Sequence, residues 1–167
     1  MFKKGEMVVY GQTGVCYIED IVEKTIIKNE KKLYYKLRPH FQQNDIIYAP
    51  INSDKVHIRY VMNRLQAEEL IEKMPEIVAK IDQMTEEENY RDILANQNRY
   101  ALAELAAKLY MKKRAANINK KKLSVSDEIY MRISEELLFG ELAFVLEIPL
   151  VEVKSYIAKK LKGKGLE

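Results

Sequence analysis

The stretch KVHIRYVMNRLQAEELIEKM, residues 55–74, contains the change of hydrophobic period that decides the fold of this chain. In its first part, Ile58 and Tyr60 alternate with polar neighbours, which is the period of a β-strand. From Asn63 onward the apolar residues recur at helical spacing. The sequence therefore predicts a β domain at residues 1–61 and a helical domain at residues 62–167, an α+β fold.

The β domain is predicted to be a small barrel. The clearest strand is residues 32–38, in which Leu33, Tyr35 and Leu37 share one face. Five short strands in about sixty residues cannot bury both faces of a flat sheet, so we expect an SH3-like or Tudor-like β-barrel. Such a barrel leaves a strand edge that a partner protein can pair with. The five predicted strands are residues 6–10, 15–25, 32–38, 46–49 and 55–61.

The helical domain is predicted to be all-α. Pro75 is expected to interrupt the first helix, because proline lacks a backbone N–H. Ser124, with Asp127 three residues later, predicts a helix start close to a capping box. Pro149 is expected in the first turn of the last helix. The predicted helices cover residues 63–74, 75–82, 86–95 and 100–116, a helix from residue 124, and a last helix ending near residue 161.

Positive charge is concentrated in one part of the helical domain. The net charge of the chain is only +3, yet residues 105–126 contain no Asp or Glu. A basic cluster of this kind can be plain solvated surface, or it can bind phosphate in a salt-dependent way. The cations in this stretch are Lys108, Lys112, Lys113, Arg114, Lys120, Lys121 and Lys122.

The sequence contains no recognisable catalytic constellation. His40 and His57 have no cysteine or paired acid at metal-ligand spacing, and no glycine-rich phosphate loop follows a strand. The single Cys16 lies in a strand-like run and is expected to be a buried thiol. No apolar segment is long enough to span a bilayer, and no secretion signal is visible. We therefore expect a cytoplasmic protein that is not an enzyme and that uses no cofactor, metal or small-molecule substrate.

An ordered series of motifs resembles the CarD/CdnL family of bacterial transcription regulators. The opening residues 2–10, followed by Gly14 and Ile21, are similar to the first two strands of that family. These motifs cover nearly the whole chain and follow one another in the same order as in the family. It continues with residues 46–50, 90–94, 105–114, 123–128 and 136–143.

This resemblance implies a function in transcription. The Tudor-like domain would dock on the β subunit of RNA polymerase, with Lys24 and Tyr48 at the positions where the family has interface arginines. The helical domain would contact promoter DNA and shift the stability of the open complex. The family commonly has a tryptophan in this domain, and this chain has none, so its DNA contact would be arranged differently. The implied DNA-binding residues are Tyr90, Arg91, Lys108, Lys112, Lys113, Arg114, Lys120, Lys121 and Lys122.

Two alternatives remain open at the level of sequence. The chain could be an adaptor that binds RNA polymerase without touching DNA. Residues 142–160 also have a helix-turn-helix cadence, in which residues 150–160 would enter the major groove. Against that interpretation, Glu147 holds the turn position that usually favours glycine, and Glu152 would face phosphates. Two packed helices at the end of a bundle would produce the same pattern.

Overall fold

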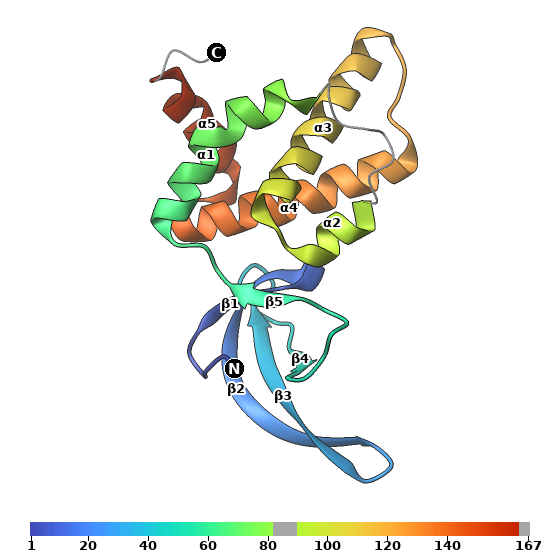
Figure 1. Cartoon of the computed structure of the whole chain (residues 1–167), viewed down its shortest axis with the longest axis vertical. Coiled ribbons are helices and arrows are strands. Elements are labelled where there is room, and N and C mark those ends of the chain that lie inside the picture. Colours follow the sequence, from blue (N-terminus) through green and yellow to red (C-terminus); the bar gives the residue numbers. More distant parts are fainter. Residues whose placement is uncertain (82–89, 164–167) are drawn as a thin grey trace. The chain divides into compact units, whose positions relative to one another are not determined.

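The structure, a computed structural model, describes residues 1–81 and 90–163 and confirms the α+β fold class (Figure 1). The chain divides into two compact units, Met1–Val61 and Met62–Glu167. The first unit, the β unit, holds an antiparallel sheet, and the second, the helical unit, holds the α-helices. Each unit has a hydrophobic core of its own.

The sheet of the β unit contains five strands in the order β4-β3-β2-β1-β5. Neighbouring strands are antiparallel, so the first four form a meander and the fifth returns to pair with the first. The edges of the sheet are therefore β4 and β5. The strands are β1 (Met7–Tyr10), β2 (Gly14–Ile27), β3 (Glu30–Pro39), β4 (Ile47–Pro50) and β5 (Ile58–Tyr60).

The sheet curls around one small core. Ala49 of β4 is buried in a cluster with Val8 of β1 and Leu37 of β3, and Ile58 of β5 packs against the same cluster. Because β4 and β5 are opposite edges, they can reach a common core only if the sheet is strongly curved, as the expected barrel requires. Leu33, which the alternation places on the same face of β3 as Tyr35 and Leu37, is 49% exposed and does not belong to this core. It lies where β2 and β3 continue beyond the other strands as a two-stranded hairpin (Figure 1).

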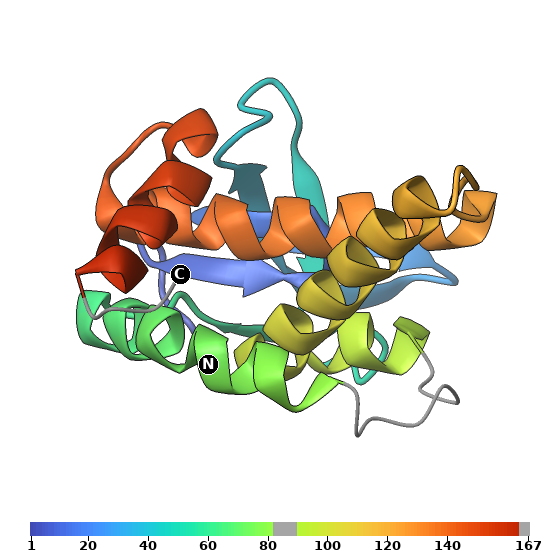
Figure 2. The same cartoon turned by 90° about the horizontal axis from the view of Figure 1, so that it is seen from above.

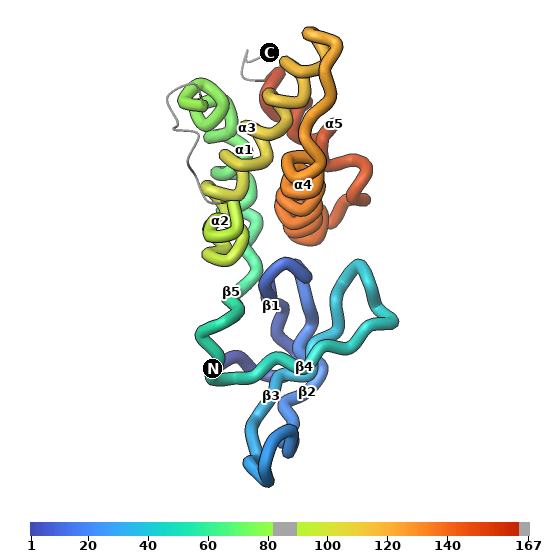
Figure 3. Tube along the Cα trace, turned by 90° about the vertical axis from the view of Figure 1, so that its right-hand side faces the viewer, coloured from blue at the N-terminus to red at the C-terminus, as the bar shows by residue number. Residues whose placement is uncertain are grey.

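The helical unit packs its helices around a core of leucine, isoleucine and alanine. Figures 2 and 3 show that α3 crosses next to α4, with α1 and α2 on the other side of α3. A short 3₁₀ turn, η3 (Leu150–Glu152), leads directly into α5. The helices are α1 (Arg64–Ala79), α2 (Tyr90–Asn96), α3 (Arg99–Ile118), α4 (Val125–Leu146) and α5 (Val153–Lys162).

Pro75 does not interrupt the first helix. The structure has one helix, α1, where the sequence predicted two at residues 63–74 and 75–82. Proline costs one backbone hydrogen bond and crowds the carbonyl of Ile71, but Ile71 and Ile77 are both buried on the core side. Packing on both sides of the proline therefore keeps the helix continuous. Of the helix predicted at residues 86–95, the structure describes the part from Tyr90 onward, and residues 86–89 lie outside the described residues.

The predicted helix starts are largely observed. The side chain of Asn63 accepts a hydrogen bond from the backbone N–H of Gln66, whose side chain accepts from the Asn63 N–H, so α1 has a complete capping box. Ser124 caps α4 by accepting from the Asp127 N–H at 3.1 Å. Pro149, by contrast, lies outside α5, because it precedes η3. It still has the fixed φ that suits the entry to a helical segment.

Candidate protein-binding and nucleic-acid interfaces

The structure brings together the two residues predicted to contact a partner protein. Lys24 is on β2 and Tyr48 is on β4, with β3 between them. The Lys24 ammonium lies 3.2 Å from the centroid of the Tyr48 ring, which is a cation–π contact. Tyr48 is 39% exposed, so the pair is accessible on the outer surface of the sheet. We call Lys24, Tyr48 and the neighbouring charges of the next paragraph the β-unit surface.

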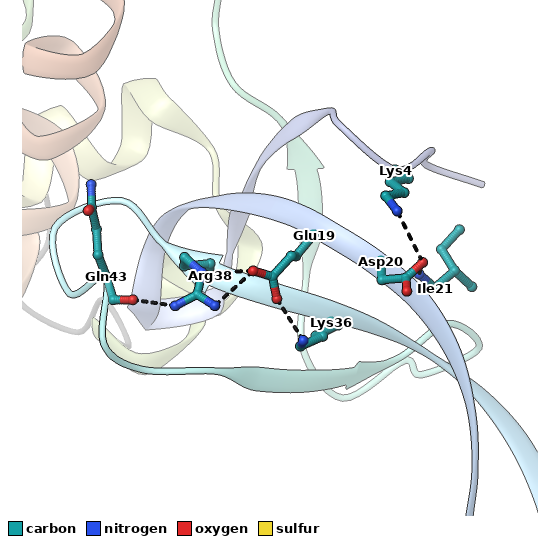
Figure 4. A network of polar contacts seen from close by, with 7 residues as sticks. All are labelled: Lys4, Glu19, Asp20, Ile21, Lys36, Arg38 and Gln43. Atoms are coloured by element: carbon teal, nitrogen blue, oxygen red, sulfur yellow. Dashed lines mark hydrogen bonds and ion pairs between the residues drawn. The ribbon is translucent and has the colours of Figure 1, made fainter.

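Three further charged residues lie beside this pair. Glu19 accepts hydrogen bonds from Lys36 at 2.8 Å and from Arg38 at 2.7 and 3.0 Å, and Arg38 also donates to the Gln43 carbonyl (Figure 4). The hydrogen bonds from Lys36 and then Arg38 hold the pKa of Glu19 below its ordinary value. Hydrogen bonding to Glu19 in turn raises the pKa of Lys36. Glu19 and Lys36 are therefore charged at neutral pH, and their contacts with each other and with Arg38 hold the side chains in place.

Glu19 was not singled out by the sequence, and its position depends on a backbone irregularity. The register of β2 against β3 shifts between Ile18 and Asp20, which leaves Glu19 at a β-bulge. A bulge re-aims a side chain relative to a regular strand. No sequence signal marks a bulge at this position, so alternation alone could not pair Glu19 with Lys36 and Arg38.

The β2–β3 hairpin exposes apolar side chains beyond the core. Ile26, Ile27 and Leu33 are 59%, 68% and 49% exposed, respectively. The turn is formed by Lys28 and Asn29, which both have positive φ, as a two-residue hairpin turn requires. Exposed apolar residues of this kind are typical of protein–protein contact surfaces, in which an apolar centre has a polar rim.

The predicted cations of the helical unit gather on one structural element. They occupy the second half of α3 and the loop that leads to α4, which together with the first turn of α4 we call the basic hairpin. From Tyr110 to the end of α3 almost every side chain is exposed. Lys112 differs from the others because its ammonium lies 2.6 Å from the carboxylate of Asp127, a residue that is only 8% exposed. Lys112 therefore also joins α3 to α4.

The tip of the basic hairpin has an unusual backbone. Helix α3 ends with the Lys121 N–H bonded to the Ala116 carbonyl at 2.8 Å and the Lys120 N–H bonded to the Asn117 carbonyl at 3.1 Å. This is a Schellman motif, and Lys120 (φ +53°) holds the left-handed position that glycine usually occupies. Ile118 and Val125, on either side of the loop, are 75% and 76% exposed. The tip thus combines Lys120, Lys121 and Lys122 with exposed apolar residues.

Tyr90 and Arg91 lie on α2 rather than on the basic hairpin. The Tyr90 ring stacks edge-on against Tyr130 of α4, with a centroid distance of 5.3 Å, and packs against the helical core. Tyr90 therefore helps to hold α2 against α4. Arg91 is exposed.

Several kinds of site are not found in the part of the chain that the structure describes. Within residues 1–81 and 90–163, no three His, Cys, Asp or Glu side chains gather as a metal site. No helix in those ranges has the length and apolar character that crossing a membrane requires. Burial raises the pKa of the Cys16 thiol to about 12, so this thiol remains protonated and unreactive at neutral pH.

Comparison with known proteins identifies the β unit. Residues 2–62 match the family of the CarD-like/TRCF RID domain, which confirms the resemblance seen in the sequence over this part of the chain. The RID domain is an RNA polymerase-interacting, protein-binding domain. A search of curated proteins finds no match to the chain.

Proposed function

We propose that this chain, whose residues 2–62 form a CarD-like/TRCF RID domain, is a transcription regulator that links RNA polymerase to promoter DNA. The β unit docks on the β subunit of RNA polymerase, and the basic hairpin of the helical unit contacts DNA. The observation that carries the proposal is the domain match. The protein would act in the cytoplasm, at the nucleoid, where the polymerase works.

The β-unit surface offers the features that protein docking needs. The cation–π contact between Lys24 and Tyr48 restricts both side chains, which reduces the side-chain entropy that they lose on binding. The adjacent ion pairs of Glu19 order a second group of charges, which favours a partner of complementary charge. The strand β4, which carries Tyr48, is an edge of the sheet and has backbone groups available for pairing.

The basic hairpin supplies a contact that depends on charge. Lys120, Lys121 and Lys122 are exposed at its tip, and Lys113 and Arg114 are exposed on α3. Cations of this density attract the phosphates of DNA without reading sequence. A protein held on the polymerase and bound to promoter DNA stabilises the open complex if it binds the open state more tightly than the closed state.

The docking proposal is tested by capture of purified RNA polymerase with the full chain. We expect Lys24→Ala and Tyr48→Ala each to weaken capture on the order of tenfold. The double variant should lose little more affinity for the polymerase than either single variant, because the two residues contact each other. Lys31→Ala is the matched control, since Lys31 is on the same hairpin in a weak, exposed ion pair. Equal capture by all variants would contradict this assignment of the docking surface.

The DNA proposal is tested by binding of the full chain to a promoter duplex at several salt concentrations. We expect Lys120→Glu, Lys121→Glu and Lys122→Glu in combination to weaken binding and to reduce its salt dependence by about one counterion per lost contact. Lys112 is left unchanged because a glutamate there would face Asp127. Unchanged DNA affinity in a folded variant that still captures polymerase would favour the adaptor without a DNA contact.

A further inference from the structure

One cation of the β-unit surface, Lys36, has a place in the sheet that brings it beside the proposed docking pair. Lys36 of β3 lies directly opposite Tyr48 of β4 in the antiparallel ladder. Residues directly opposite each other have their side chains on the same face of the sheet, with Cβ atoms about 5 Å apart. The Lys24 ammonium reaches the same Tyr48 ring from β2, at 3.2 Å from its centroid. Lys24 and Lys36 therefore both border Tyr48.

The two cations that pair with Glu19 differ in the hydrogen-bonding capacity that they have left. Arg38 is engaged at all of its side-chain nitrogens, because Nε and one terminal nitrogen donate to Glu19 and the other donates to the Gln43 carbonyl (Figure 4). Among the described residues, Lys36 makes its ion pair with Glu19 alone, at 2.8 Å, although an ammonium has three N–H donors. Lys36 therefore has donors left for a partner, whereas Arg38 serves to hold Glu19.

The acidic residues near Lys36 do not neutralise this part of the surface. Glu19 is shared between Lys36 and Arg38, so one positive charge of this group is left over. Asp20, which lies opposite Lys36 on β2, has its own partner in Lys4 at 3.9 Å (Figure 4). The surface around Lys36 therefore keeps an excess of positive charge, to which the neighbouring lysine of β2 adds.

Lys36 is accessible and ordered at the same time. Its side chain is 29% exposed, beside a tyrosine that is 39% exposed. Hydrogen bonding to Glu19 raises the pKa of Lys36 and keeps its ammonium charged. A half-buried charge is screened by salt less than a fully exposed one, so a contact with it contributes more to binding. Such a cation suits a contact with a carboxylate of a partner protein.

We propose that Lys36 is a further contact residue for RNA polymerase and that it binds a carboxylate of the polymerase together with Lys24. The polymerase segment that docks there carries an aspartate or glutamate, and Tyr48 packs beside it. This inference rests on the proposed function, because it takes the β-unit surface to be the docking site. It deepens that function by assigning the contact to Lys36 rather than to Arg38, and by giving the sign of the partner's charge.

The experiment is capture of purified RNA polymerase by the full chain at several salt concentrations. We expect Lys36→Ala to weaken capture on the order of tenfold and to reduce its salt dependence, because a charge pair with the polymerase is lost. Lys36→Gln keeps a hydrogen-bond donor for Glu19 but no charge, so it should weaken capture similarly without disturbing the fold. Lys36→Arg, which keeps the charge, should retain most of the capture. Lys31→Ala is the matched control, because it removes a lysine from the other face of the same strand.

The outcomes separate this inference from the proposed function. Weaker capture in Lys24→Ala and Tyr48→Ala, with unchanged capture in Lys36→Gln, would overturn the contact of Lys36 and leave the docking surface standing. Unchanged capture in all of these variants would overturn both. Equal weakening by Lys31→Ala would show that capture follows total charge, which would overturn the inference as well. A loss of promoter binding in Lys36→Gln, with polymerase capture intact, would assign this lysine to DNA and overturn it too.

Discussion

At the scale of single residues, Glu68 is the contact that joins α1 to α5. Burial opposes ionisation of this carboxyl, but hydrogen bonds from Lys160 and Tyr156 outweigh burial and hold its pKa below the ordinary value. A carboxylate with a lowered pKa in the folded state adds stability above the pKa of the unfolded chain. That contribution is lost as the pH falls through the folded-state pKa.

We predict that Glu68→Gln lowers the free energy of unfolding by about 1 kcal/mol near pH 7. The difference from wild-type should shrink as the pH falls below the ordinary glutamate pKa of about 4.3, because the unfolded chain then takes up a proton, and it should vanish once the pH has passed through the lower folded-state pKa. Urea unfolding of both proteins across this pH range measures the difference in their free energies of unfolding. A difference that stays constant down to the lowest pH would show that the glutamate charge contributes nothing.

Lys120 has a left-handed backbone conformation that costs free energy, and it carries a positive charge at the tip of the basic hairpin. We predict that Lys120→Gly raises the free energy of unfolding by about 1 kcal/mol, because glycine adopts positive φ without a steric penalty. The same change should lower the salt dependence of DNA binding by about one counterion. Thermal unfolding and DNA titration at several salt concentrations measure the two effects.

Glu147→Gly is the matched control for that prediction. Glu147 occupies the same left-handed position at the end of α4, so its replacement should also stabilise the protein. It carries no positive charge, so the salt dependence of DNA binding should stay as in wild-type. If both variants changed this salt dependence equally, the effect of Lys120→Gly would come from the fold and not from a phosphate contact.

Residue types could be predicted from the sequence, but their partners could not. The resemblance selected Lys24 and Tyr48, yet their contact depends on the register of three strands. The run of cations predicted the basic hairpin, but not that Lys112 is paired with Asp127. Pairing of this kind is decided by how α3 and α4 cross, which is tertiary geometry. The assignment of Lys113, Arg114 and the loop lysines to DNA stays a prediction.

At the scale of elements, Pro75 is the residue that local rules interpreted wrongly. Propensity describes an isolated helix, whereas α1 is held by buried residues on both sides of the proline. The strands and the remaining helices were predicted well, because their apolar residues follow a clear period. The exposure of Leu33 has a related reason, because alternation gives the face of a strand but not how far the core extends along it.

We predict that Pro75→Ala raises the free energy of unfolding by roughly 1–3 kcal/mol, because alanine restores a backbone hydrogen bond to the Ile71 carbonyl and relieves crowding there. Thermal and urea unfolding of the full chain measure this change in the free energy of unfolding. Ala79→Pro, near the end of the same helix, is the reciprocal change and should destabilise. A loss of stability in Pro75→Ala would mean that a bend at the proline is needed to bury Ile77.

At the scale of the whole molecule, each unit has what independent folding requires. The β unit has a core of Val8, Cys16, Ile18, Tyr35, Leu37 and Ala49, and the helical unit has a larger one of its own. The start of the helical unit is fixed within that unit, because the Met62 N–H donates to the buried Glu141 carboxylate at 2.8 Å. Division of the chain between Val61 and Met62 therefore cuts neither core.

The last prediction concerns what is gained by having both units in one chain. Residues 1–61 alone should capture RNA polymerase about as well as the full chain when no DNA is present, since the RID domain carries that contact. On polymerase bound to a promoter, the full chain should bind more tightly than either fragment. The reason is that the second contact then forms within one complex, at an effective concentration in the millimolar range.

Competition between labelled full chain and unlabelled fragments on promoter-bound polymerase measures this gain. We expect residues 1–61 to compete poorly, and an equimolar mixture of the two fragments to compete no better than residues 1–61 alone. Raising the salt concentration should remove the advantage of the full chain, because it weakens the DNA contact and leaves protein docking less affected. An advantage that persists at high salt would place the second contact on protein instead of DNA, and the adaptor would then be the correct description.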